Sequence, residues 1–139
     1  MGQRLNTKLL MTVTSLFLAL AGATCLFAPA ELAAALGLPI SASLSVFVQL
    51  AGALYLAFAL TNWAAKGSMI GGIYSRPLSI GNLFHFTVGT FSLLKYTLSQ
   101  GLHLPAAIAL AIYVLFAALF TYLVFGFSPG KDAGQAKSN

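Results

Sequence analysis

Four long apolar runs divide the chain, and the short segments between them hold many of its polar residues. A transmembrane α-helix needs about 20 apolar residues at a rise of about 1.5 Å each, and every run comes close to that length. The runs lack the alternation of apolar and polar residues that a membrane β-strand requires. The pattern therefore predicts an all-α membrane protein, a bundle of four transmembrane helices at residues 9–28, 43–63, 78–96 and 105–127.

The segment PAELAAALGLP, between the first and second runs, predicts a short additional helix. Pro29 suits a first helical turn, and Glu31 complements the positive end of the helix dipole. Gly37 and Pro39 then end the helix. We expect this helix to lie at the membrane interface, between transmembrane helices 1 and 2.

The length of 139 residues is that of one domain, so residues 1–127 are predicted to form a single transmembrane domain. The segment 128–139 is polar and contains glycine and lysine, which predicts a disordered tail. The first run has a second interpretation as a signal peptide, with Ala21-Gly22-Ala23 as the cleavage site. Because the apolar residues continue to Ala28, beyond that site, a retained helix is the favoured interpretation.

Composition supports the membrane assignment, because 59% of the residues are hydrophobic and only 6% are charged. A soluble fold has about a quarter of its residues charged. The net charge of +5 comes from basic residues scattered singly, without the basic face of a nucleic-acid-binding protein. Their distribution favours a multi-pass protein of the cytoplasmic (inner) membrane with both termini in the cytoplasm. This orientation leaves only Lys95 outside and places six basic residues inside: Arg4, Lys8, Lys66, Arg76, Lys131 and Lys137.

Small and polar residues recur at spacings of three and four along the first three runs, which places them on one face of each helix. The faces comprise Thr12, Ser15, Ala19 and Gly22 in the first run, Gly52, Tyr55, Ala59 and Asn62 in the second, and Asn82, His85, Gly89, Ser92 and Tyr96 in the third. Membrane helices pack through such residues. A packing role is therefore the favoured interpretation, and a pocket or pathway for a ligand is the alternative.

His85 is the main candidate for function, because ionisable residues inside a membrane are costly and are often functional. Asn62 and Asn82 lie at a similar depth if the second and third helices are antiparallel neighbours, and Arg76 lies at the cytoplasmic rim. Together with Tyr55 they form the candidate ligand-binding site. The alternatives for His85 are a structural hydrogen bond to Asn82, Asn62 or a backbone carbonyl, and a role in proton transfer. Haem ligation is the least favoured alternative, because His103 lies on the outer side and cannot supply a second axial ligand within one chain.

Catalytic groups are scarce in this sequence. Glu31 and Asp132 are its only carboxylates, and the predicted topology places them on opposite sides of the membrane, which excludes a carboxylate pair. Cys25 is the only cysteine, so no intrachain disulfide and no C-x-x-C motif can form. We therefore predict no catalytic residue and no metal site, expect no cofactor, and consider an enzyme the less favoured class.

Three stretches, LFAPAELAAALGLP, VQLAGALYLAFALTNWAAKG and GNLFHFTVG, resemble small uncharacterised membrane proteins of the DoxX-like type. The resemblance covers roughly residues 9–125. It implies a compact four-helix bundle in the bacterial cytoplasmic membrane. Some DoxX-like proteins are associated with quinone-linked oxidoreductases, so the resemblance also implies a quinone or a lipid as a ligand.

Three functions are compatible with these observations. The small size and the missing catalytic groups favour a non-enzymatic accessory or assembly subunit of a membrane complex. The first alternative is a binder of a hydrophobic small molecule, a quinone or a lipid, in a pocket within the bundle near His85. The second alternative is a small transporter or channel, which would require a homo-oligomer. The expected partners are the lipid bilayer, other membrane subunits or further copies of the chain, and not nucleic acid.

Overall fold

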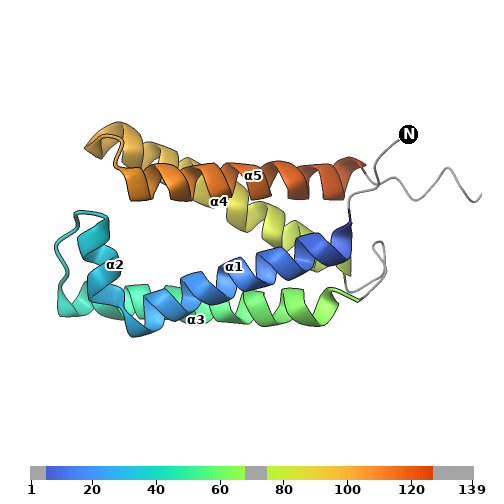
Figure 1. Cartoon of the computed structure of the whole chain (residues 1–139), viewed down its shortest axis with the longest axis horizontal. Coiled ribbons are helices and arrows are strands. Elements are labelled where there is room, and N and C mark those ends of the chain that lie inside the picture. The colour runs from blue at the N-terminus through green and yellow to red at the C-terminus, as the bar shows by residue number, and fades with distance from the viewer. Residues whose placement is uncertain (1–5, 68–74, 127–139) are drawn as a thin grey trace, which may run out of the picture.

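The computed structural model describes residues 6–67 and 75–126, and their regular structure is entirely α-helical (Figure 1). The described residues form five helices: α1 (Thr7–Phe27), α2 (Pro29–Ala35), α3 (Ala42–Ala65), α4 (Ser75–Gln100) and α5 (Leu104–Gly126). The prediction of an all-α fold is confirmed, and the four long helices coincide with the four apolar runs. The predicted disordered tail, 128–139, lies outside the described residues.

Three of these helices, α1, α3 and α5, are long and apolar enough to cross a membrane. They indicate a multi-pass membrane protein. Helix α4 has 26 residues, about 39 Å at 1.5 Å per residue, so its length would also suffice. It does not belong to this apolar class, because polar residues such as Asn82, His85 and Thr97 lower its hydropathy.

The predicted short helix between the first two long helices is present as α2. Pro29 occupies the start of α2, and Glu31 lies in its first turn. At its end, Gly37 adopts a φ of 68°, a conformation that glycine reaches without steric cost. The Leu38 N–H then donates to the Ala33 carbonyl at 2.9 Å, which closes a Schellman cap. The glycine and the proline thus bound this helix as the sequence predicts.

Helices α1 and α3 pack closely against each other through small residues. A Cβ atom built on Gly22 would lie 2.8 Å from the Gly52 carbonyl oxygen, and one built on Gly52 would lie 2.9 Å from the Gly22 carbonyl oxygen. The Ser15 hydroxyl donates to the Ala59 carbonyl at 2.7 Å from the same face. These residues belong to the small and polar faces that the sequence predicts, and they let the two backbones approach.

Helices α4 and α5 form the second close pair. Phe86 of α4 is fully buried and stacks on two rings of α5, with centroid distances of 4.7 Å to Phe116 and 5.9 Å to Phe120. Phe17 of α1 also reaches this cluster, 5.4 Å from the Phe116 ring. The aromatic cluster is therefore one connection between the two helix pairs.

The two pairs are close together at one end and diverge toward the other (Figure 1). They meet where α3 ends and α4 begins, and they separate in the direction of α2. At the divergent end, the Tyr96 hydroxyl of α4 donates to the Leu36 carbonyl, just after α2, at 2.5 Å. This bond ties the second pair to the segment that follows α2.

Candidate functional site

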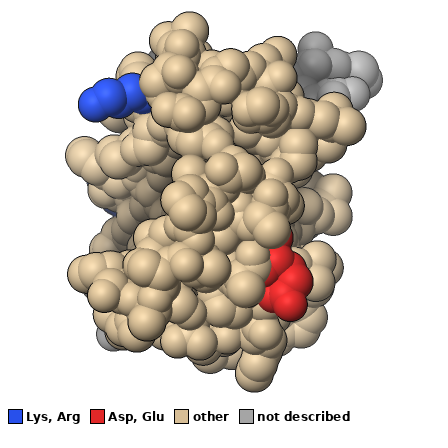
Figure 2. All heavy atoms as spheres, turned by 90° about the vertical axis from the view of Figure 1, so that its left-hand side faces the viewer, with Lys and Arg blue, Asp and Glu red and all other residues tan. Residues whose placement is uncertain are grey.

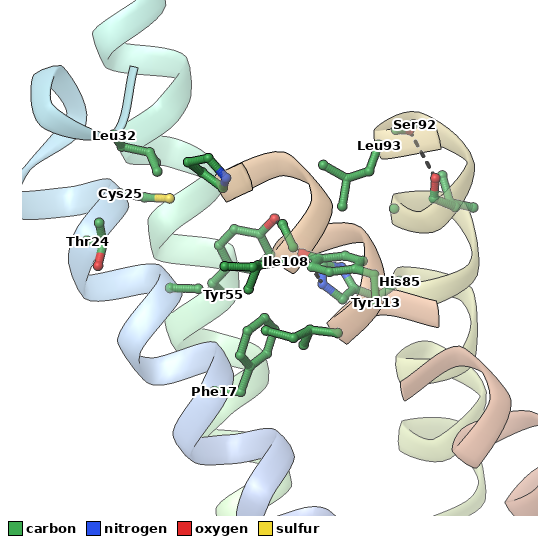
Figure 3. Close-up of a pocket in the computed structure, with 16 residues that line it drawn as sticks. Phe17, Thr24, Cys25, Leu32, Tyr55, His85, Ser92, Leu93, Ile108 and Tyr113 are labelled. Carbon is green, nitrogen blue, oxygen red and sulfur yellow. Dashed lines mark hydrogen bonds between the residues drawn. The ribbon is translucent and has the colours of Figure 1, made fainter. Parts of the chain in front are cut away.

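A partly open cavity of about 700 Å³ lies between the two helix pairs (Figure 3). All five helices contribute to its lining, including Phe17 and Cys25 from α1, Leu32 from α2, Tyr55 from α3, His85 from α4 and Tyr113 from α5. Ligand pockets in proteins commonly have volumes of about 300 to 1,000 Å³. The cavity is therefore large enough for a small organic molecule.

The walls of the cavity are mostly apolar. Side chains such as Leu93, Ile108 and Ile112 face it, and its described lining includes no Asp, Glu, Lys or Arg. Pockets for small molecules combine apolar walls with a few placed polar groups. The polar lining includes Thr24 and Ser92, whose hydroxyls donate within their own helices, and a group of side chains where α3, α4 and α5 approach one another.

Tyr55, Tyr113 and His85 form this polar group, which we call the Tyr-Tyr-His chain. The Tyr55 and Tyr113 hydroxyl oxygens lie 3.0 Å apart, and the Tyr113 hydroxyl lies 3.3 Å from His85 Nε2. The three side chains come from different helices and point toward one another (Figure 3). The Phe58 ring stacks on the His85 imidazole, with 5.9 Å between the ring centroids, and helps to fix the orientation of the imidazole.

Gly89 explains how Tyr113 reaches His85. It lies four residues after His85, on the same face of α4. A Cβ atom built on Gly89 would lie less than 3.0 Å from two carbons of the Tyr113 ring. Any larger residue would displace that ring, so the glycine provides the space in which Tyr113 packs against α4 and extends its hydroxyl to the imidazole.

Asn62 and Asn82 form a separate, fully buried pair that joins α3 to α4. Each amide donates to the oxygen of the other, at 3.0 Å from Asn62 and 2.8 Å from Asn82. Each also donates its second N–H to its own helix, to the carbonyl of Phe58 or Leu78. All four N–H groups and both side-chain oxygens are thus engaged, which is the arrangement of a structural connection between helices.

The structure therefore divides the predicted site into separate parts. It brings Tyr55 together with His85 at the cavity, whereas Asn62 and Asn82 bind each other and are absent from the residues that line the cavity. Arg76 is exposed in the first turn of α4 and is also absent from that lining. The helix faces predicted from the sequence are thus largely the packing faces, and only part of them adjoins the cavity.

Sequence reasoning did not select Tyr113, the central member of the Tyr-Tyr-His chain. Its side chain is 8% exposed in the middle of the most apolar run. A signal was available, because a buried tyrosine hydroxyl usually needs a hydrogen-bond partner. A tyrosine inside an apolar span therefore indicates a polar group on a neighbouring helix.

The described residues include no group of three His, Cys, Asp or Glu side chains that could hold a metal ion. The Tyr-Tyr-His chain offers neutral donors and acceptors at one place in an apolar cavity, an arrangement that can orient a bound molecule. Comparison of the chain with family models, with curated proteins and with solved structures finds no match in any of the three. The resemblance to DoxX-like proteins stays a prediction.

Proposed function

We propose that this protein binds a hydrophobic small molecule, a quinone or a lipid, in the cavity between its two helix pairs. The supporting observation is the cavity itself, which combines a volume of about 700 Å³ with apolar walls and the Tyr-Tyr-His chain. Apolar walls supply affinity, and a few polar groups fix the orientation of the ligand.

The cavity is the reason for placing this function ahead of the accessory-subunit hypothesis that composition alone favours. A bundle whose role is only structural gains stability from close packing, because a void forfeits contacts between its lining atoms. A binding protein keeps such a volume open for its ligand. The accessory-subunit role stays a prediction from the sequence.

The proposed membrane arrangement has α4 as the fourth span of a DoxX-like bundle, with both termini in the cytoplasm of a bacterial cell. In α4 some of the polar residues turn inward, since Asn82 is fully buried and Thr97 is 8% exposed, whereas Ser92 and Lys95 are exposed. The opposite face presents Phe84, Phe91 and Leu98, which are 66%, 67% and 78% exposed. Polar residues inside and apolar residues outside are the distribution expected of a lipid-facing helix.

Filling the cavity tests the proposal. A double variant, Ala21→Phe with Ala109→Phe, introduces two rings from opposite sides of the cavity. A matched control, Ala53→Phe with Ala111→Phe, introduces the same rings at exposed positions outside the cavity lining. Mass spectrometry of organic extracts identifies the hydrophobic compounds that co-purify with each protein, and circular dichroism verifies the helical content.

We expect the wild-type protein and the control variant to retain the same compound in near-stoichiometric amount. The cavity-filling variant should lose it while it keeps its helical content. Equal retention by the folded cavity-filling variant would refute the proposal, as would a wild-type protein that carries no compound and binds none on addition.

A further inference from the structure

We infer that the ligand of the cavity has a neutral head with a carbonyl or hydroxyl oxygen, held by the Tyr-Tyr-His chain, and that charged amphiphiles are excluded. This inference rests on the proposed function and specifies its ligand class. It follows from the charge of the lining and from the number of hydrogens that Tyr55, Tyr113 and His85 can share.

Charge is the first argument. The described residues that line the cavity include no acidic or basic side chain other than His85. Burying a charged head without a partner carries a large desolvation penalty. The end of the molecule that holds α2 is also largely uncharged, with charged atoms limited to small areas of that face (Figure 2). A carboxylate or phosphate head would therefore lack compensation in this cavity.

The count of hydrogens is the second argument. Two hydrogen bonds link the three side chains, and either tyrosine can be the donor between Tyr55 and Tyr113. When His85 Nε2 carries a hydrogen, the chain has three hydrogens for two internal bonds. One tyrosine O–H then remains free, and it can donate to a carbonyl oxygen of a ligand.

The other tautomer of His85 reverses this preference. With Nε2 unprotonated, the Tyr113 hydroxyl donates to the imidazole and the Tyr55 hydroxyl donates to Tyr113. Both tyrosine hydrogens are then used, and the Tyr55 oxygen retains only acceptor capacity. It can accept a hydrogen bond from a ligand hydroxyl. The two tautomers have the same net charge. The site can therefore bind either a carbonyl head or a hydroxyl head while the His85 side chain stays uncharged.

A panel of ligands with one tail and different heads tests the inference. Four probes carry a decyl chain on a benzene, a 1,4-benzoquinone, a hydroquinone or a benzoate ring, and a long-chain primary alcohol is the fifth. Native mass spectrometry of the purified full-length protein measures the affinity for each probe. The ring probes isolate the effect of the head, and the alcohol distinguishes an aliphatic lipid from a quinone.

We expect the quinone and the hydroquinone to bind with affinities within about threefold of each other, because each has a matching tautomer. Each should bind roughly tenfold more tightly than decylbenzene, the ratio expected for one hydrogen bond. The benzoate should bind more weakly than decylbenzene. A preference shown by the alcohol alone would support the same head chemistry and assign it to an aliphatic lipid.

Tyrosine variants identify the atoms responsible. The double variant Tyr55→Phe with Tyr113→Phe removes both hydroxyls and should bring the preference for the quinone over decylbenzene close to one, while decylbenzene still binds. Each single variant leaves one hydroxyl and should retain part of the preference. Tyr122→Phe is the matched control, because Tyr122 is an exposed tyrosine of α5 outside the cavity lining. It should retain the wild-type preference. A variant that merely unfolds would lose decylbenzene as well.

The outcomes separate this inference from the proposed function. Benzoate binding as tight as quinone binding, or equal binding of the oxygenated probes and decylbenzene, would overturn the inference and leave the cavity as a binding site. A preference that survives in full in the double variant Tyr55→Phe with Tyr113→Phe would also overturn it. If no probe binds, decylbenzene included, the proposed function itself is refuted.

Discussion

Removal of the asparagine pair between α3 and α4 should reveal strong energetic coupling. Asn82→Leu eliminates the two hydrogen bonds of the asparagine pair and leaves one N–H and the side-chain oxygen of Asn62 buried without these partners. Interhelical hydrogen bonds in membrane proteins contribute about 0.6 to 2 kcal/mol each. The two bonds therefore correspond to a loss of roughly 2 kcal/mol of unfolding free energy, and Asn62→Leu should cost a similar amount.

The double variant should cost little more than either single variant, because it leaves no stranded polar group. The coupling energy of the cycle is then about 2 kcal/mol, well above the 0.3 to 0.5 kcal/mol scatter of independent sites. Reversible unfolding of the purified protein in mixed micelles with increasing SDS measures the four free energies. Thr61→Val is the matched control, since the exposed Thr61 hydroxyl donates within its own helix, to the carbonyls of Ala57 and Phe58. Additive effects of the two asparagine substitutions would refute this reasoning.

Three further predictions concern a buried hydroxyl, a close helix contact and a hydrogen bond near α2. Thr14→Val should raise the unfolding free energy by about 1 kcal/mol in the same assay, because the buried Thr14 hydroxyl has no hydrogen-bond partner among the described residues; a loss of stability would contradict this. Gly52→Ala should lower the unfolding free energy by about 1 to 3 kcal/mol, because the new Cβ would clash with the α1 backbone. An unchanged free energy would show that α1 and α3 can move apart without loss of stability. Tyr96→Phe should remove the bond to the Leu36 carbonyl and increase hydrogen exchange in α2, measured by mass spectrometry, whereas Tyr122→Phe should not. Equal exchange in both variants would argue against a tie between α4 and this segment.

The sequence predicts much of this fold because the relevant signals are local. Run length predicts the long helices, and Pro29 with Gly37 predicts the bounds of α2. The small residues of the first two runs also predict a close approach, which the structure shows at Gly22 and Gly52. These features depend on periodicity and backbone conformation, and both can be read from neighbouring positions.

The site is less predictable, because it depends on which helices diverge. The sequence predicts a similar depth for Asn62, Asn82 and His85. In the structure, however, the two asparagines form hydrogen bonds with each other, and His85 approaches Tyr113 of α5. The spacing of residues along one helix does not predict how far apart two helix pairs lie. The cavity results from that separation, so tertiary structure was needed to find it.

The pairing of the helices also has a consequence for how the protein is made. Helix α5 follows its packing partner α4 after a connection of only three residues, 101–103, and the α1 and α3 partners are also close along the chain. Contacts between such near neighbours form early, so each pair can assemble soon after its segments leave the ribosome. The cavity is complete only when the finished halves dock in the bilayer. Formation of each helix pair and formation of the cavity are thus expected to be separate steps of folding.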